Sequence, residues 1–254
     1  MTIETTFTPA EFETLRQRDL SDTACVVFDV LRATSTIVTA LARGAESILP
    51  VATIEEALQH RAADSTVLLA GERHGLRISA AVSGSVDFDL GNSPREYASA
   101  VVRHRRLVTT TTNGTRAFAA CRGARFVLAG SFLNLNRTAQ HVQRLNCDKL
   151  VLICSGTGEE PAFEDNLGAG ALCQQLIEMD KTVQLSDSAR FAAEQFAAHQ
   201  DDLEAAMEKS SNARRLLSIP ELHDDVSFCL TRNVYPIIVF ANAQGWLQRA
   251  DLNL

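Results

Sequence analysis

Short apolar runs alternate with helix-like segments along most of the chain, and this alternation limits the fold more than any other feature. Buried strands are indicated at 24–30, 47–51, 66–71, 106–112, 125–131 and 149–156. Most of these runs are continuously apolar, which is typical of strands that helices cover on both faces. The pattern predicts an α/β fold, a three-layer α/β/α arrangement around a mainly parallel sheet, with mixed strand directions left open.

The C-terminal part of the chain has a different character. Residues 187–218 are polar and helical in pattern, and they predict extra helices that cover the sheet. The segment 234–246 returns to strand character, and Pro236 suggests a sheet edge or a strand start. Because no low-complexity linker divides the chain, we expect a single domain over residues 1–254. The alternative is two lobes around a cleft, with 187–218 as a helical cover.

Charge, hydropathy and cysteine content argue against a nucleic-acid-binding, membrane or secreted protein. The net charge of −7, without any run of Lys or Arg, argues against a nucleic-acid-binding surface. No apolar run is long enough to span a membrane, and the N-terminus lacks the features of a signal peptide. The six cysteines are scattered without a CxxC pair, as in a reduced, cytoplasmic protein. We expect a cytoplasmic protein with a small-molecule partner, and we leave a homodimer open.

The segment ACVVFDVLRATST carries the densest chemistry of the chain. A carboxylate, a guanidinium and three hydroxyls follow its strand, namely Asp29, Arg32, Thr34, Ser35 and Thr36. Ligands of open α/β sheets bind beyond the carboxyl ends of strands, and a helix N-terminus attracts anions. These groups suit a phosphoester and its metal ion. If Asp29 and Thr34 only cap the helix, Arg32 stays unexplained.

Polar loops follow other strand candidates as well. They contribute Glu72, Arg73, Ser93, Asn113, Gly114, Thr115 and the acidic group Glu159, Glu164 and Asp165. The carboxyl ends of parallel strands share one edge, so we expect these loops to converge. Alternative interpretations are a simple turn at Asn113–Gly114, a surface pair at Glu72–Arg73 and a helix cap at Asp224–Asp225.

These residues predict a magnesium–phosphate site. The expected Mg²⁺ ligands are Asp29, Glu72 and Asp165, with Glu164 as a further candidate. The expected phosphoryl-binding residues are Arg32, Thr34, Ser35, Thr36, Asn113, Gly114 and Thr115, while Arg73 or Ser93 holds the acid end of the substrate. The expected catalytic residues are Asp29, Arg32, Glu159 and Glu164. Asp29 acts as nucleophile or metal ligand, and Glu159 or Glu164 protonates the leaving oxygen.

Several known phosphate chemistries do not fit the sequence. A Cys-x5-Arg phosphatase would need Arg where Glu160 stands, six residues after Cys154. A haloacid-dehalogenase-type enzyme would need a second Asp where Leu31 stands. Walker A and GxGxxG patterns are also missing from the sequence. The residues therefore favour a different class of phosphatase.

Taken together, the motifs FDVLRATSTI, GER, GNSP, TTTNGT, GSFLN and CSGTGEEPAFEDNLGAG resemble the 2-phosphosulfolactate phosphatase family, with DDVSFCL as a weaker trailing match. The resemblance implies a magnesium-dependent hydrolysis of 2-phospho-3-sulfolactate to 3-sulfolactate and phosphate. In methanogens that step belongs to coenzyme M biosynthesis. The alternatives are a phosphatase for another small 2-phospho acid and a non-catalytic protein that binds an anionic metabolite.

Overall fold

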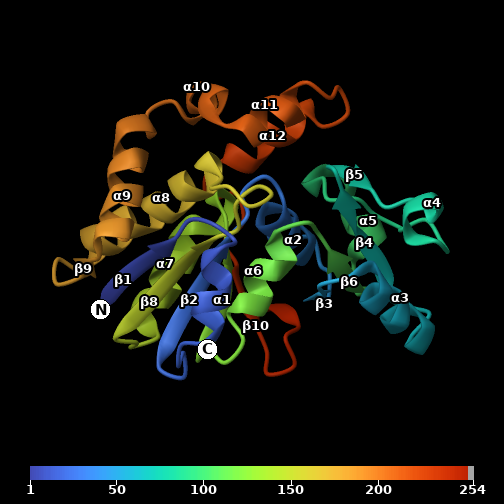
Figure 1. Cartoon of the computed structure of the whole chain (residues 1–254), viewed down its shortest axis with the longest axis horizontal. Coiled ribbons are helices and arrows are strands. Elements are labelled where there is room, and N and C mark those ends of the chain that lie inside the picture. The colour runs from blue at the N-terminus through green and yellow to red at the C-terminus, as the bar shows by residue number, and fades with distance from the viewer. Residues whose placement is uncertain (251–254) are drawn as a thin grey trace.

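The computed structural model describes residues 1–250 of the chain (Figure 1). Its strands are β1 (Thr2–Thr6), β2 (Thr23–Phe28), β3 (Ser47–Pro50), β4 (Leu68–Arg73), β5 (Leu76–Arg77), β6 (Arg106–Thr110), β7 (Phe126–Gly130), β8 (Lys149–Cys154), β9 (Gln184–Leu185), β10 (Ile238–Ala241) and β11 (Leu247–Ala250). Its α-helices are α1 (Glu11–Arg16), α2 (Ala33–Ala42), α3 (Ile54–Ala63), α4 (Ala80–Ser83), α5 (Ser99–Val102), α6 (Gly114–Ala120), α7 (Leu135–Arg144), α8 (Phe163–Met179), α9 (Asp187–His199), α10 (Leu203–Ala206), α11 (Ser211–Leu217) and α12 (His223–Leu230). Short 3-10 helices are η1 (Pro94–Glu96), η2 (Phe132–Asn134) and η3 (Met207–Lys209).

The strands form one sheet in the order β5-β4-β6-β3-β11-β10-β7-β2-β8-β1-β9. We call β7, β2, β8, β1 and β9 the β2 half, because all of these strands run parallel. We call β3, β6, β4 and β5 the β4 half, in which only β5 is antiparallel. The α/β prediction is confirmed, and the sheet is mixed.

The two halves are joined by the antiparallel hairpin β10–β11. Within the described residues, β10 pairs with β7 only at Phe240 and Leu128, and β11 pairs with β3 only at Leu247 and Ile48. The strands of the sheet are therefore not all parallel, and their carboxyl ends do not all lie along one edge. The carboxyl ends of β2 and β4 nevertheless both lie below α11 and α12 (Figure 1).

Strand β2 explains why the strongest apolar run of the sequence is continuous. Every residue of the strand is buried. Val26 and Phe28 pack into the apolar cluster on one face of the sheet, whereas Cys25 and Val27 pack into the cluster on the other face. Side chains alternate between the faces of a strand, so two covered faces require apolar residues at every position. The strand thus fixes the position of Asp29 directly after it.

Helices occupy the segment predicted as a helical cover, from α9 through α11, and α12 follows. Strand β10 lies inside the sheet between β11 and β7, so the edge-strand interpretation is wrong and Pro236 instead precedes the strand. Whether the chain divides into one domain or two lobes stays a prediction. No helix within residues 1–250 is long and apolar enough to cross a membrane.

Candidate active site

A cavity of about 420 Å³ opens where loops from both halves of the sheet meet α11. The loops after β2, β6 and β8, the end of β4 with the turn that follows it, the segment before η1 and the helix α11 line the cavity. The lining residues are Asp29, Leu31, Arg32, Glu72, Arg73, His74, Gly75, Asn92, Thr111, Thr112, Asn113, Gly156, Thr157, Gly158, Asn212 and Arg215. The structure therefore brings together four of the polar loops that the sequence analysis expected to converge.

Asp29 sits at the junction of β2 and α2 and has one oxygen free. Its Oδ1 accepts a hydrogen bond from the backbone N–H of Ala33 at 2.9 Å. Within residues 1–250, no donor contacts Oδ2, and Asp29 lines the cavity. A Cβ added at Gly114 would lie 2.6 Å from Oδ2, so the glycine allows the close approach of α6. Asp29 thus caps α2 with one oxygen and presents the other for chemistry.

Negative charge collects around Asp29. The pKa of Asp29 is raised to about 7, mainly by burial and also by the neighbouring carboxylates of Glu72 and Glu164. Burial likewise raises the pKa of Asp165 well above its usual value, with Asp29 and Glu164 adding to the shift. All four side chains are buried. A bound cation would relieve this accumulation of like charge.

Asp165 ties together two loops of the β2 half. Its Oδ1 accepts the N–H of Val30 at 2.7 Å, and its Oδ2 accepts the N–H of Gly156 at 3.1 Å. The carboxylate therefore holds the loop after β2 beside the loop after β8. Asp165 does not line the cavity itself, and both of its oxygens have backbone partners.

Glu72 holds two loops of the β4 half together, as Asp165 does in the β2 half. Its Oε2 accepts the N–H of Gly75 at 2.6 Å, and its Oε1 accepts the N–H and hydroxyl of Thr112, each at 2.9 Å. Arg73 lies beside it and donates to the carbonyl of Glu72 and to the hydroxyl of Thr110, at 2.7 and 3.1 Å. Glu72 and Arg73 are thus a built part of the cavity wall rather than a loose surface pair.

Glu164 connects the sheet to the C-terminal helices. Its Oε2 accepts the hydroxyl of Ser210 at 2.6 Å, and its Oε1 accepts the amide of Asn212 at 2.8 Å. The same amide donates to the carbonyl of Leu31 at 2.8 Å. Glu164 is fully buried and lies outside the cavity lining, so it holds α11 over the site.

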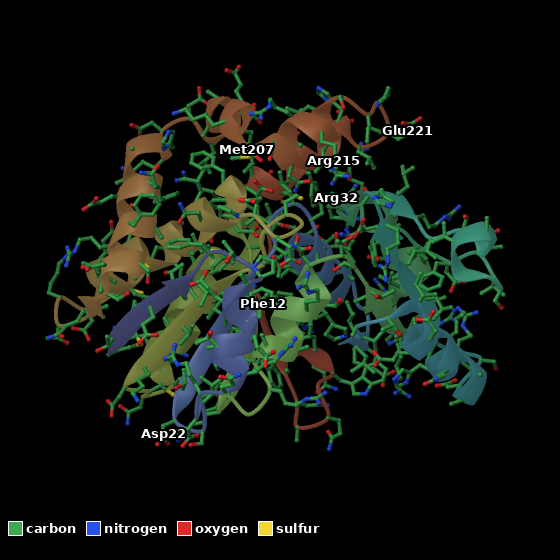
Figure 2. All side chains as sticks on the ribbon, in the orientation of Figure 1. Phe12, Asp22, Arg32, Met207, Arg215 and Glu221 are labelled. Carbon is green, nitrogen blue, oxygen red and sulfur yellow. The ribbon has the colours of Figure 1, made fainter. Side chains whose placement is uncertain are left out.

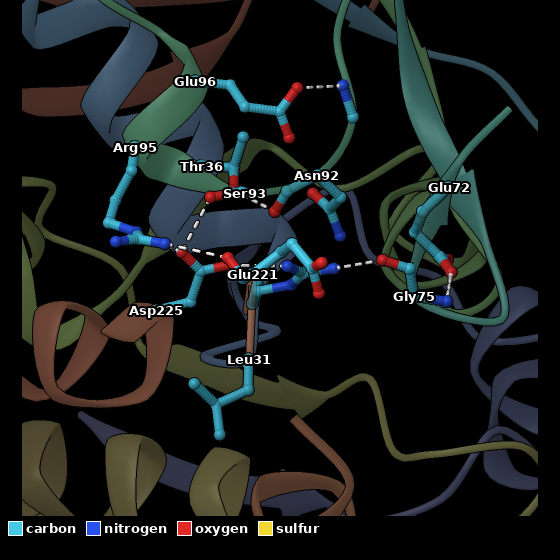
Figure 3. Close-up of polar contacts among 12 residues, drawn as sticks. Leu31, Thr36, Glu72, Gly75, Asn92, Ser93, Arg95, Glu96, Glu221 and Asp225 are labelled. Carbon is cyan, nitrogen blue, oxygen red and sulfur yellow. Dashed lines mark hydrogen bonds and ion pairs between the residues drawn. The ribbon is translucent and has the colours of Figure 1, made fainter. Parts of the chain in front are cut away.

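Arg32 lines the cavity and is anchored by Asp225 of α12. The guanidinium donates to the Asp225 carboxylate at 2.5 Å and to the carbonyl of Gly75 at 2.7 Å. The same carboxylate accepts the hydroxyl of Ser93 at 2.7 Å and Nε of Arg95 at 2.9 Å (Figure 3). Both side chains of the Arg32–Asp225 pair are almost fully buried. Ser93 therefore contacts Asp225 and does not line the cavity.

The sequence favoured a helix cap at Asp224–Asp225 over a role in the site, because a pair of acids before an apolar run is typical of a helix start. The weaker trailing match at DDVSFCL was the signal for the larger role of Asp225. No motif in the sequence indicated that Asn212, Arg215 and His74 would line the cavity.

The three hydroxyls after Arg32 bond to backbone and lie outside the lining of this cavity. Thr34 exchanges hydrogen bonds with the backbone of Asp29 at 3.0 and 3.1 Å. Ser35 donates to the carbonyl of Val30, and Thr36 donates to the carbonyl of Asn92, each at 2.8 Å. All three are buried. These hydrogen bonds stabilise the start of α2. The predicted contact of the three hydroxyls with a phosphoryl group stays a prediction.

Asn113 joins the two halves of the sheet at the floor of the cavity. Its amide donates to the carbonyl oxygens of Ser155 and Gly158 at 3.0 and 2.9 Å, while its buried Oδ1 has no partner. Thr115 is also buried, and its hydroxyl donates to the carbonyl of Thr111 at 3.1 Å. Asn113 thus belongs to the cavity, whereas Thr115 stabilises the start of α6.

Glu159 lies apart from the other predicted site residues. Its side chain is 66% exposed and pairs with Arg116 at 2.9 Å. It does not line the cavity, although its neighbours Gly156, Thr157 and Gly158 do. Its predicted role as a proton donor therefore has no geometric support in this conformation.

Comparison with known proteins adds to this geometry. The family model described as 2-phosphosulpholactate phosphatase matches residues 10–244. The chain belongs to this family. A relative from Thermotoga petrophila is 39% identical over 213 residues, which cover 84% of this chain and 86% of the relative. A relative from Carboxydothermus hydrogenoformans is 37% identical over 235 residues, which cover 92% and 91%.

A third family member, from Clostridium acetobutylicum, is 32% identical over 225 residues, which cover 88% of this chain and 92% of the relative. All three relatives carry the name "Probable 2-phosphosulfolactate phosphatase". The matched region of the family model includes every residue that lines the cavity. The family resemblance predicted from the sequence motifs is confirmed.

Proposed function

We propose that the protein is a magnesium-dependent phosphomonoesterase that hydrolyses 2-phospho-3-sulfolactate to 3-sulfolactate and phosphate. Membership in the family and the names of its relatives support this reaction. The observation that carries the proposal is the free Oδ2 of Asp29, which faces a cavity lined by three arginines. A reactive carboxylate surrounded by guanidinium groups suits a small, multiply charged phosphoester.

The residues fit a divalent cation. Asp29 and Glu72 both line the cavity, and Asp165 and Glu164 add buried negative charge behind them. The described residues contain no group of three or more His, Cys, Asp or Glu arranged as a metal site. Magnesium commonly takes only one or two protein carboxylates, with water and phosphate oxygens completing its shell. We propose Asp29, through its free Oδ2, as the direct protein ligand, while Glu72, whose two oxygens already accept hydrogen bonds, contributes negative charge to the ion through water.

When bound, magnesium would neutralise phosphoryl charge and lower the barrier to attack on phosphorus. Arg32 donates to phosphoryl oxygens through N–H groups that Asp225 and Gly75 leave free. Because Asp225 and Gly75 hold the guanidinium from two sides, it needs little reorganisation when the substrate arrives.

The reaction breaks the bond between phosphorus and the ester oxygen. The electron pair goes to that oxygen, which takes up a proton and becomes the hydroxyl of 3-sulfolactate. Asp29 either attacks phosphorus through Oδ2 and forms an aspartyl phosphate that water then hydrolyses to phosphate and free Asp29, or it would hold the metal ion while water itself attacks phosphorus. Neither Glu159 nor Glu164 lines the cavity, so we propose water in the open cavity as the proton source.

Phosphate release from a panel of 2-phospho acids, with and without magnesium, tests the proposal. Turnover of 2-phospho-3-sulfolactate should exceed that of the other esters, should stop after EDTA treatment and should return with Mg²⁺. Full activity in metal-free enzyme would exclude the metal proposal. The absence of turnover with every ester would exclude a phosphatase and leave a metabolite-binding protein.

Isotope labelling separates the two roles of Asp29. A hydroxylamine-labile phosphoenzyme, trapped by rapid quench, should form only if Asp29 is the nucleophile. Single-turnover hydrolysis in ¹⁸O-water should then label the Asp29 carboxylate if water attacks the carbonyl carbon of the aspartyl phosphate, and phosphate if water attacks its phosphorus. Label in phosphate without a trapped phosphoenzyme would instead mean that water attacks the phosphorus of the substrate directly.

We also propose a cytoplasmic location, supported by six cysteines that are all free and buried. The homodimer stays a prediction, as does the link to coenzyme M biosynthesis. Light scattering of the purified protein measures the oligomeric state directly.

A further inference from the structure

Helix α11 brings to the cavity a guanidinium that the sequence analysis did not single out. Arg215 lines the cavity from above, on the same side as Arg32 (Figure 2). A Cβ added at Gly75 would lie 3.0 Å from Nη1 of Arg215. The guanidinium therefore lies against the tip of the β4–β5 hairpin, and α11 and the hairpin enclose the cavity between them.

Asn212 holds this guanidinium in place. Its Oδ1 accepts Nη2 of Arg215 at 2.8 Å. Its amide donates to the carbonyl of Leu31 and to the carboxylate of Glu164, which fixes the orientation of the Asn212 side chain. Arg215 is thus positioned by a buried residue that is itself anchored to the β2 half, and its placement does not depend on a surface contact.

The charge of Arg215 is not matched by a protein carboxylate. Arg32 pairs with Asp225, but among the described residues neither Arg73 nor Arg215 forms an ion pair. The two guanidinium groups donate to backbone carbonyls, a hydroxyl and an amide oxygen. A cavity-facing guanidinium without a counter-ion is a binding group for an anion.

We propose that Arg215 binds an oxyanion of the substrate other than the phosphoryl group, either the carboxylate or the sulfonate. Through this contact Arg215 determines substrate specificity. The inference rests on the proposed function, because 2-phospho-3-sulfolactate carries a carboxylate and a sulfonate besides its phosphoryl group. Asp29 and Arg32 serve the phosphoryl end. Arg215 serves the other end, where a planar fork of donors suits either oxyanion.

Calorimetric titration tests the assignment without turnover. The probes are 3-sulfolactate, which has both oxyanions, and inorganic phosphate, which stands for the other end of the substrate. Arg215→Ala should weaken the binding of 3-sulfolactate about 10- to 100-fold, the loss expected for a charge-assisted hydrogen bond. It should leave phosphate binding within about twofold. Lactate and isethionate, each with one of the two oxyanions, show whether carboxylate or sulfonate is bound.

Arg214→Ala is the matched control. Arg214 is the same residue type in the same helix and is exposed like Arg215, but it does not line the cavity. Both arginines lie in the last turn of α11, so both favour its dipole equally. Arg215→Lys keeps the charge and loses the fork, so it should fall between wild type and Arg215→Ala.

The outcomes separate this inference from the proposed function. Unchanged 3-sulfolactate binding in Arg215→Ala, or equal losses for 3-sulfolactate and phosphate, would overturn the assignment of Arg215. So would a wild-type protein that binds no 3-sulfolactate. A wild-type protein that binds 3-sulfolactate through Arg215 but releases no phosphate from 2-phospho-3-sulfolactate would contradict the proposed function alone.

Discussion

Each half of the sheet holds two loops together with one buried carboxylate, but the two halves present different groups to the cavity. In the β2 half, Asp165 holds the loops after β2 and β8 together through two backbone N–H groups. In the β4 half, Glu72 holds the β4–β5 turn and the loop after β6 together through two others. Each half therefore builds its wall of the cavity around one buried carboxylate that accepts from both loops.

What the two halves present to the cavity differs. The β2 half presents Asp29, with an oxygen free of hydrogen bonds, and the buried acids behind it. The β4 half presents Arg73 and the tip of the hairpin, against which Arg32 and Arg215 lie. The comparison indicates that the β2 half supplies the reactive carboxylate, while the β4 half completes an arginine-rich wall that recognises charge.

The largest expected effect comes from removing the free carboxylate. Asp29→Asn should lower kcat about 10³-fold or more, because it replaces a carboxylate that has a free oxygen at the cavity by a neutral amide. Glu72→Gln should lower kcat only about 10- to 100-fold, by loosening the wall of the β4 half. Steady-state kinetics with both variants, checked for folding by circular dichroism, measures the difference. Equal losses would make Glu72 as direct a participant as Asp29.

The second effect concerns the ion pair that reaches from α12 to the loop after β2. Asp225→Asn should lower activity about 10²-fold and destabilise the fold by about 3 kcal/mol, because it leaves the Arg32 charge buried without its counter-ion. Arg95→Ala removes only a half-exposed partner of Asp225 and is the control. In an Arg32→Lys background, Asp225→Asn should cause little further loss of activity. Additive losses would show that Asp225 does not act through Arg32.

The third effect is on stability and depends on pH. The folded protein binds the Asp29 proton more tightly than the unfolded chain, since the pKa rises from 3.8 to about 7. This stabilisation is complete below about pH 4 and is lost as the pH rises through about 7. The melting temperature of metal-free protein should therefore fall over this window, and Asp29→Asn should reduce the fall. Asp165 contributes in the same direction in both proteins. A pH-independent difference between the two would contradict the shift.

The smallest expected effect is at Glu159. Glu159→Gln should change kcat by less than about twofold, since an exposed ion pair contributes little and the residue lies outside the cavity lining. The pH profile of kcat should also keep its shape. A large loss, or the disappearance of one limb of the profile, would restore Glu159 as the proton donor.

The sequence was informative wherever a strand ended in a polar loop. Asp29 and Asn113 follow apolar strands, Glu72 and Arg73 end one, and all four line the cavity. The prediction was a mainly parallel sheet with mixed strand directions left open, and these loops converge because both halves direct their carboxyl ends to the same place. Local pattern thus identified the loops without identifying the topology that joins them.

Contacts between residues far apart in the sequence could not be predicted from local sequence patterns. Asp225 lies 193 residues from Arg32, and Asn212 lies 181 residues from Leu31, so no spacing pattern links them. The hydroxyls of Thr34, Ser35 and Thr36 each have a backbone partner in the structure, which the sequence did not indicate. A hydroxyl at a helix start can bond to the backbone or to an anion, so their predicted contact with a phosphoryl group stays a prediction.

The position of the β10–β11 hairpin in the chain has a consequence for biosynthesis. Residues 238–250 supply the only strands that link β3 with β7 within the described part of the sheet, and they leave the ribosome after all the other strands. During translation the hydrogen-bonded ladder therefore exists as two separate pieces, each with its own buried carboxylate already able to organise its loops. A nascent chain acquires a continuous sheet only after this hairpin has been made.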